Sequence, residues 1–186
     1  MVTTNMAAAA GAVTTMLLTW VKYGKPDVSM TLNGGLAGLV AITAGTDVVS
    51  VAGSFWIGVI AGIAIVYAVE FVDQKMKIDD PVGAISAHGV CGALGTILTG
   101  VFSVKDGLLY TGNPHFLMIQ VLGVVVVALY VFVAINIVFR IIKATNGLRV
   151  TREEEINGLD FEEHGLVSAY ADFMMAPDTT AEALEA

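Results

Sequence analysis

The chain has 186 residues, of which 56% are apolar and only 14% are charged, and its mean hydropathy is +0.78. About a quarter of the residues in a typical soluble domain are charged, so this composition excludes an ordinary soluble globular protein and indicates a membrane protein. The formal net charge is −8. The single cysteine, Cys91, lies in an apolar stretch and excludes an intrachain disulfide.

Five apolar stretches follow one another along the chain, separated by short polar segments. A helix needs about 17–25 residues to cross the hydrocarbon core of a bilayer, and each stretch approaches that length. The sequence therefore predicts an all-α, polytopic transmembrane helix bundle with five spans. We expect a transmembrane domain over residues 1–143 and a cytoplasmic C-terminal tail over 144–186. The predicted spans are about 4–21, 31–49, 54–72, 83–103 and 116–139.

Small residues recur in the first four spans at spacings that let membrane helices pack closely. The first three spans carry small residues four apart, and the fourth carries glycines three apart. The fifth span is bulky and β-branched, with Gly123 as its main exception, which suits a helix that faces lipid. The small residues are Ala7 and Gly11, Gly34 and Gly38, Gly58 and Gly62, then Gly89, Gly92 and Gly95.

The fourth span has the most informative start. Asp80 and Pro81 precede it, and we expect Asp80 at the N-cap and Pro81 at the first helical position. A direct proton or cation site at Asp80 is the alternative. His88 lies further into the apolar run, where an ionisable side chain is costly and marks either a polar pathway or a contact with a neighbouring helix.

Basic residues assign the orientation. When the two membrane faces are numbered by alternation across five helices, Lys105 stands alone on one face and the other basic residues share the opposite one. Short loops rich in Lys and Arg stay in the cytoplasm, which predicts an outside N-terminus and a cytoplasmic C-terminus. The residues of the basic face are Lys22, Lys25, Lys75, Lys77, Arg140, Lys143, Arg149 and Arg152.

The segment from Ile78 to Thr96, Ile-Asp-Asp-Pro-Val-Gly-Ala-Ile-Ser-Ala-His-Gly-Val-Cys-Gly-Ala-Leu-Gly-Thr, resembles the characteristic motif of ammonium transporters of the Amt/MEP/Rh superfamily. The opening Thr4-Asn-Met-Ala-Ala-Ala-Ala-Gly11 and the tail after Gly147 resemble other parts of that family in the same order. The resemblance covers roughly residues 3–172. It implies an inverted-repeat fold of eleven helices, of which this chain would supply the last five and the cytoplasmic tail.

The resemblance also implies functional residues and partners. His88 matches one of two pore histidines, Thr43 lies near the inner part of the pathway, and Ala84 lines its cytoplasmic side. The family assembles as a homotrimer, and its tail is regulatory, with a PII signalling protein docking at the cytoplasmic face. Tail residues that carry the resemblance are Gly158, Asp160, His164 and Tyr170.

The sequence therefore predicts ammonium or ammonia transport across the plasma membrane through a hydrophobic, histidine-containing pore, with this chain as its C-terminal half. The alternative is a non-conducting truncated fragment, or a regulatory or assembly subunit of such a transporter. The lipid bilayer is an expected partner and nucleic acid is not. No enzyme activity, cofactor or metal is predicted, because no nucleophile–base pair, metal-ligand cluster or phosphate loop is apparent.

Overall fold

The computed structural model describes residues 1–80, 82–159, 163 and 165. The chain forms two compact units, Met1–Val131 and Phe132–Ala186. The division falls inside a long helix, whereas the sequence places the end of the membrane domain at 143, where the apolar run meets basic residues. The division after Val131 reflects contacts within the chain, whereas the boundary at 143 concerns contact with lipid. The boundary of the membrane domain therefore stays a prediction.

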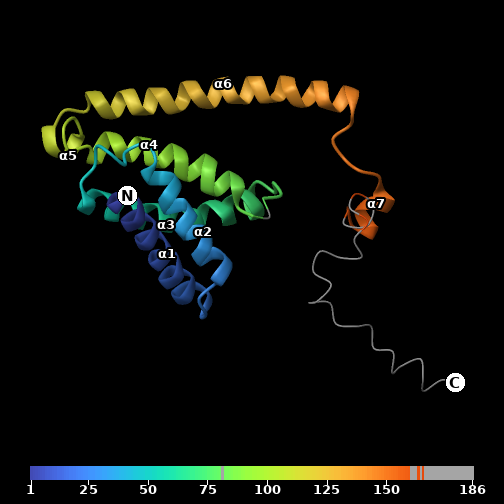
Figure 1. Ribbon diagram of the computed structural model, residues 1–186, viewed down its shortest axis with the longest axis horizontal. Coiled ribbons are helices and arrows are strands. Elements are labelled where there is room, and N and C mark those ends of the chain that lie inside the picture. Colours follow the sequence, from blue (N-terminus) through green and yellow to red (C-terminus); the bar gives the residue numbers. More distant parts are fainter. Residues whose placement is uncertain (81, 160–162, 164, 166–186) are drawn as a thin grey trace, which may run out of the picture. The chain divides into compact units, whose positions relative to one another are not determined.

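Every predicted apolar stretch contains a helix, and the described residues form helices and turns with a single isolated bridge between Val49 and Ser103. Figure 1 shows the helices in chain order. They are α1 (Val2–Tyr23), α2 (Val28–Ile42), α3 (Val51–Glu70) with the π-helical turn η1 (Phe71–Lys75), the π-helical turn η2 (Ile85–Val90) with α4 (Cys91–Phe102), α5 (Leu108–Thr111), α6 (His115–Thr145) and α7 (Arg152–Asn157). The all-α prediction is confirmed.

Among the described residues, three helical stretches are long and apolar enough to cross a membrane: Val51–Lys75, Ile85–Phe102 and His115–Thr145, with mean hydropathies of 2.2, 1.5 and 2.9. Helix α1 has 22 residues but is less apolar, because threonines and an asparagine interrupt it. Helix α2 has 15 residues and is about 22 Å long, shorter than the hydrocarbon core of about 30 Å.

Helix α2 differs from the predicted second span, 31–49, at both ends. Helix α2 begins earlier, at Val28, where the Asp27 carboxylate caps the Met30 N–H at 2.9 Å. It ends at Ile42, and the chain turns over 43–48. This turn brings Gly45 against α4, where a Cβ at Gly45 would stand 2.7 Å from the Thr99 hydroxyl oxygen.

Helix α1 packs between α2 and α3 through small residues, as the spacing predicts. A Cβ added at Gly38 or at Gly58 would lie 2.2 or 2.3 Å from the carbonyl oxygen of Ala7, so both helices touch the α1 backbone itself. The buried Thr15 hydroxyl donates to the Gly62 carbonyl oxygen at 2.8 Å and ties α1 to α3. Such polar bonds between small-residue faces are a common means of holding membrane helices together.

Helix α4 packs against the C-terminal part of α2. At Gly95, an added Cβ would lie 2.1 Å from the Ala41 carbonyl oxygen, so the two backbones meet there. The adjoining core is apolar and includes Ile57, Ile65 and Cys91, all fully buried. This contact places the helix that carries His88 against the rest of the first unit.

One charged cluster joins the ends of α1 and α3. Glu70 accepts hydrogen bonds from the Lys22 ammonium and the Tyr23 hydroxyl. The Lys22 ammonium also lies 4.6 Å from the centre of the Tyr67 ring. The apolar stem of Lys22 reaches along the helix so that its charge stays at the end of the bundle.

The second unit contains the C-terminal part of α6 and the short helix α7. No described residue of α6 is buried, which agrees with a helix that presents its side chains to lipid. Helix α7 starts with a capping box, in which the Thr151 hydroxyl accepts from the Glu154 N–H while the Glu154 carboxylate accepts from the Thr151 N–H. The Thr151 hydroxyl and the Thr151 backbone N–H, in that order, lower the pKa of Glu154 below its usual value.

Candidate functional site

His88 lies in η2, the π-helical turn that opens the fourth membrane stretch and continues as α4. The stretch begins at Ile85, so His88 lies about 4.5 Å along its axis, closer to the end of the helix than the predicted span of 83–103 indicates. A π-helical turn widens the helix locally, and such turns are frequent at functional sites. The side chain of His88 is exposed within the described chain.

Asp80 holds the first turn of this helix in place. Its buried carboxylate accepts from the Ile85 N–H at 3.1 Å, from the Ser86 N–H at 3.2 Å and from the Ser86 hydroxyl at 3.2 Å. The helix therefore starts about four residues later than the expected N-cap at Asp80. A turn at Gly83 lies between Asp80 and the start of the helix. Gly83 adopts a left-handed φ of 68°, and its N–H donates to the Asp80 carbonyl oxygen. Pro81 lies outside the described residues.

The Asp80 carboxylate is held in its charged form. Burial by itself raises its pKa, but the hydrogen bonds from the backbone of Ile85 and Ser86 and from the Ser86 hydroxyl outweigh that effect, so the pKa lies below the usual value for an aspartate. A charged carboxylate is a stronger acceptor than a neutral one, which anchors the turn that presents His88.

A groove of about 380 Å³ lies beside His88, between the α4 side and the first half of α6. Glycines and alanines leave it open: a Cβ at Gly92 would meet only a Val40 methyl at 3.5 Å, and one at Gly123 would meet nothing within 4 Å. The walls are almost entirely apolar apart from the imidazole and one hydroxyl. The lining residues are His88, Gly89, Gly92, Ala93, Thr96, Gly123, Val124, Val127, Ala128 and Val131.

The three fourth-span glycines thus divide into two kinds. Gly95 serves close packing against α2, whereas Gly89 and Gly92 line the groove. The α6 side of the groove was not predicted from the sequence. The available signal was Gly123, the small residue that interrupts an otherwise bulky span, but nothing in the linear pattern indicates which helix it faces.

The other predicted site residues lie apart from the groove. Ala84 is exposed at the start of the π-helical turn. Thr43 is exposed at the end of α2, where its hydroxyl donates to the carbonyl oxygens of Leu39 and Val40 at 2.9 and 2.6 Å. Gly158 ends α7 with a φ of 89°. The remaining tail residues, Asp160, His164 and Tyr170, lie outside the described residues.

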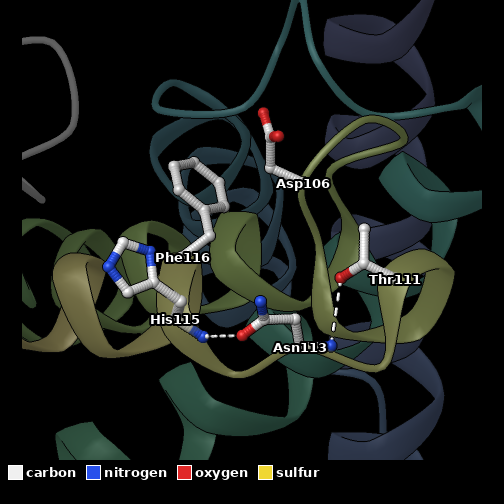
Figure 2. A pocket seen from close by; sticks show the side chains of 5 residues that line it. All are labelled: Asp106, Thr111, Asn113, His115 and Phe116. Atoms are coloured by element: carbon white, nitrogen blue, oxygen red, sulfur yellow. Dashed lines mark hydrogen bonds between the residues drawn. The ribbon is translucent and has the colours of Figure 1, made fainter.

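A second, more polar pocket of about 180 Å³ surrounds the start of α6 (Figure 2). Its polar groups stabilise the turn: the Asn113 side-chain oxygen Oδ1 accepts from the His115 N–H at 2.9 Å, and the Thr111 hydroxyl accepts from the backbone N–H of Asn113 at 3.1 Å. Figure 2 shows the Asp106 carboxylate pointing away from the His115 ring, so the two side chains do not converge on a ligand.

The groove can accept a small, uncharged molecule in a mainly apolar environment, with one imidazole to donate or accept a hydrogen bond. A bare cation would lose its hydration there without a carboxylate to replace it. Within the described ranges, no cluster of three or more His, Cys, Asp or Glu side chains could hold a metal ion. Fold and site together define a helical, polytopic membrane protein with a histidine beside an apolar groove.

Comparisons with known proteins identify the family. A model of the Ammonium Transporter Family matches residues 1–169, and the chain belongs to that family. It is 44% identical over 183 residues to ammonium transporter Amt2 of Archaeoglobus fulgidus, which covers 92% of this chain and 38% of that protein. It is 39% identical over 170 residues to an ammonium transporter of Aquifex aeolicus, with 89% and 40% covered.

The solved structures agree with this assignment. The protein described as "Sensor Amt Protein" superposes with a TM-score of 0.80 at 38% identity, and the match covers 88% of this chain and 41% of that one. The chain spans about two fifths of the length of the curated relatives it matches. The prediction of an ammonium transporter family member is confirmed.

Proposed function

We propose that this chain supplies the C-terminal half of an ammonium transporter and that His88 faces the path of the permeating molecule. The observation that carries the proposal is the exposed imidazole of His88 at the side of an apolar groove, on a helix that packs against α2 through Gly95. Two half-repeats that meet at such a face form a pathway near the middle of many transporters.

The chemistry of the groove suits ammonium better than other monovalent cations. Ammonium and potassium have similar charge and size, so a ring of oxygen ligands would hold both. An apolar passage makes it costly to move an unsolvated cation. Ammonium can release a proton and cross as neutral ammonia, which an imidazole can guide by one hydrogen bond, whereas potassium has no neutral form.

Other residues contribute around this path in our proposal. Asp80 is a positioning residue, since its carboxylate organises the turn that presents His88. Thr43 lies near the inner part of the pathway, and Ala84 lines its cytoplasmic side.

The orientation, assembly and tail form part of the same proposal. The N-terminus lies outside and the C-terminus in the cytoplasm, in the plasma membrane, as the basic residues indicate. The complete transporter is a homotrimer. The tail, including Gly158, Asp160, His164 and Tyr170, is a regulatory element, and a PII signalling protein is its partner at the cytoplasmic face.

A complementation experiment tests the role of His88. The chain is expressed with the first half of a related transporter in cells that lack ammonium uptake, and growth at low ammonium is measured together with potassium discrimination. We expect no growth from the chain alone, because His88 borders an open groove, and growth from the pair. His88→Ala should then change transport or selectivity strongly, while His115→Ala, the matched control, should not.

Two outcomes decide against parts of the proposal. Transport and selectivity unchanged in His88→Ala would give the histidine a structural role only. Absence of transport with any first half, while the chain is inserted and folded, would favour a non-conducting regulatory or assembly subunit.

A further inference from the structure

We propose that the C-terminal end of α6 carries a binding site for anionic phospholipid headgroups, formed by Arg140 and Lys143. This inference goes beyond transport and does not depend on whether the chain conducts. Its starting point is the position of two exposed basic side chains at the end of the longest apolar helix in the described chain.

The apolar part of α6 is long enough to cross the bilayer and reach the headgroups. No charged residue occurs between Phe116 and Phe139, and a helix over that range is about 36 Å long, against about 30 Å of hydrocarbon. Arg140 follows directly. None of the residues of α6 is buried in the described chain, and Arg140 and Lys143 lie beyond Val131, the last of its residues that lines the groove.

Arg140 and Lys143 project from the same side of the helix, because residues three apart are neighbours on a helical surface. Apolar side chains surround them: Phe139, Ile141 and Ile142 remain 50%, 58% and 37% exposed. Basic side chains with long apolar stems, set among exposed apolar residues, lie at the boundary between acyl chains and headgroups. This arrangement distinguishes the pair from basic residues on a fully solvated surface.

Within the described residues, neither Arg140 nor Lys143 forms an ion pair with a carboxylate. The two ion pairs found there join Lys22 to Glu70 and Arg149 to Glu155. A phosphodiester next to the end of α6 would supply the negative charge. Clustered Lys and Arg beside a membrane helix attract anionic lipids, and each basic residue near the surface increases that attraction about fivefold.

We commit to a membrane phospholipid rather than a soluble phosphate as the occupant. The pair stands where a spanning helix leaves the hydrocarbon, so a lipid headgroup is held at the right depth by its own acyl chains. A soluble anion would have to be held by two exposed side chains alone, without a buried polar group to help.

The test compares lipid binding to the full chain in detergent, by mass spectrometry of intact protein–lipid complexes. The probes are phosphatidylglycerol and phosphatidylcholine with identical acyl chains. We expect a preference for phosphatidylglycerol that falls about 25-fold in R140Q/K143Q at low ionic strength and survives in R140K/K143R. The matched control K105Q removes one basic charge from another exposed position and should keep the preference.

Three results would overturn the proposal: an unchanged preference in R140Q/K143Q, an equal loss in K105Q, or equally tight binding of soluble glycerol phosphate. The substituted side chains are exposed, so the variants should keep the thermal stability of the parent chain. If R140Q/K143Q unfolds, the single variants R140Q and K143Q take its place, and each should lose about fivefold in preference.

Discussion

Gly95→Ala tests the contact that holds the histidine-bearing helix against the rest of the bundle. The added Cβ would stand 2.1 Å from the carbonyl oxygen and 2.4 Å from the Cα of Ala41. Both atoms belong to backbone, so no side chain can rotate away. Ordinary contact begins near 3.4 Å, which requires α2 and α4 to separate by about 1.3 Å, the difference between 3.4 and 2.1.

The energy follows from that separation. Overpacking of a close contact costs about 1–3 kcal/mol, and an obstacle made of backbone places this site at the upper end. Replacing glycine by alanine inside a helix returns about 1 kcal/mol. We therefore expect Gly95→Ala to lower the free energy of unfolding by about 2 kcal/mol.

Gly92→Ala, one turn away, is the matched control. Its Cβ would meet only a Val40 methyl at 3.5 Å, an ordinary contact, so the variant should keep only the helix-forming gain of up to about 1 kcal/mol. Reversible unfolding in mixed micelles, followed through the tryptophan fluorescence of the chain, measures both variants. Equal stabilities for the two variants would refute the close contact between α2 and α4.

Three further predictions concern hydrogen bonds. Asp80→Asn should lower the free energy of unfolding at neutral pH by about 1–2 kcal/mol. Because the pKa of Asp80 is lowered in the folded chain, the parent chain should lose this contribution as the pH falls below about 4. Thermal unfolding measured against pH should show that loss in the parent chain and not in the variant. Thr15→Val should cost about 1 kcal/mol, since it leaves the Gly62 carbonyl without its buried donor, and a stability equal to that of the parent in micelle unfolding would contradict the bond. Thr151→Ala should weaken α7 by about 1 kcal/mol and speed amide exchange at Glu154, and unchanged exchange would count against the capping box.

The local sequence was enough to predict the helices, because an apolar stretch long enough to cross a bilayer has few alternatives to a helix. A backbone in hydrocarbon must bond to itself, so a long apolar stretch such as 116–139 becomes a helix whatever surrounds it. The end of α2 could not be found this way. Residues 43–49 mix apolar residues with Thr43, Thr46 and Asp47, and this pattern does not place the helix end at Ile42. In the structure, Gly45 of the following turn lies against Thr99, about fifty residues further along the chain.

The same division applies to the site. An ionisable residue in an apolar run marks His88 from the sequence alone, since its cost in lipid needs a compensating role. The tertiary structure decided which of the neighbouring glycines pack and which line a groove: Gly95 meets the backbone of Ala41, while Gly92 lines the groove with Gly123 of α6. Glycines three apart look alike in a linear pattern, and only the position of the opposing helix separates a tight contact from an open passage.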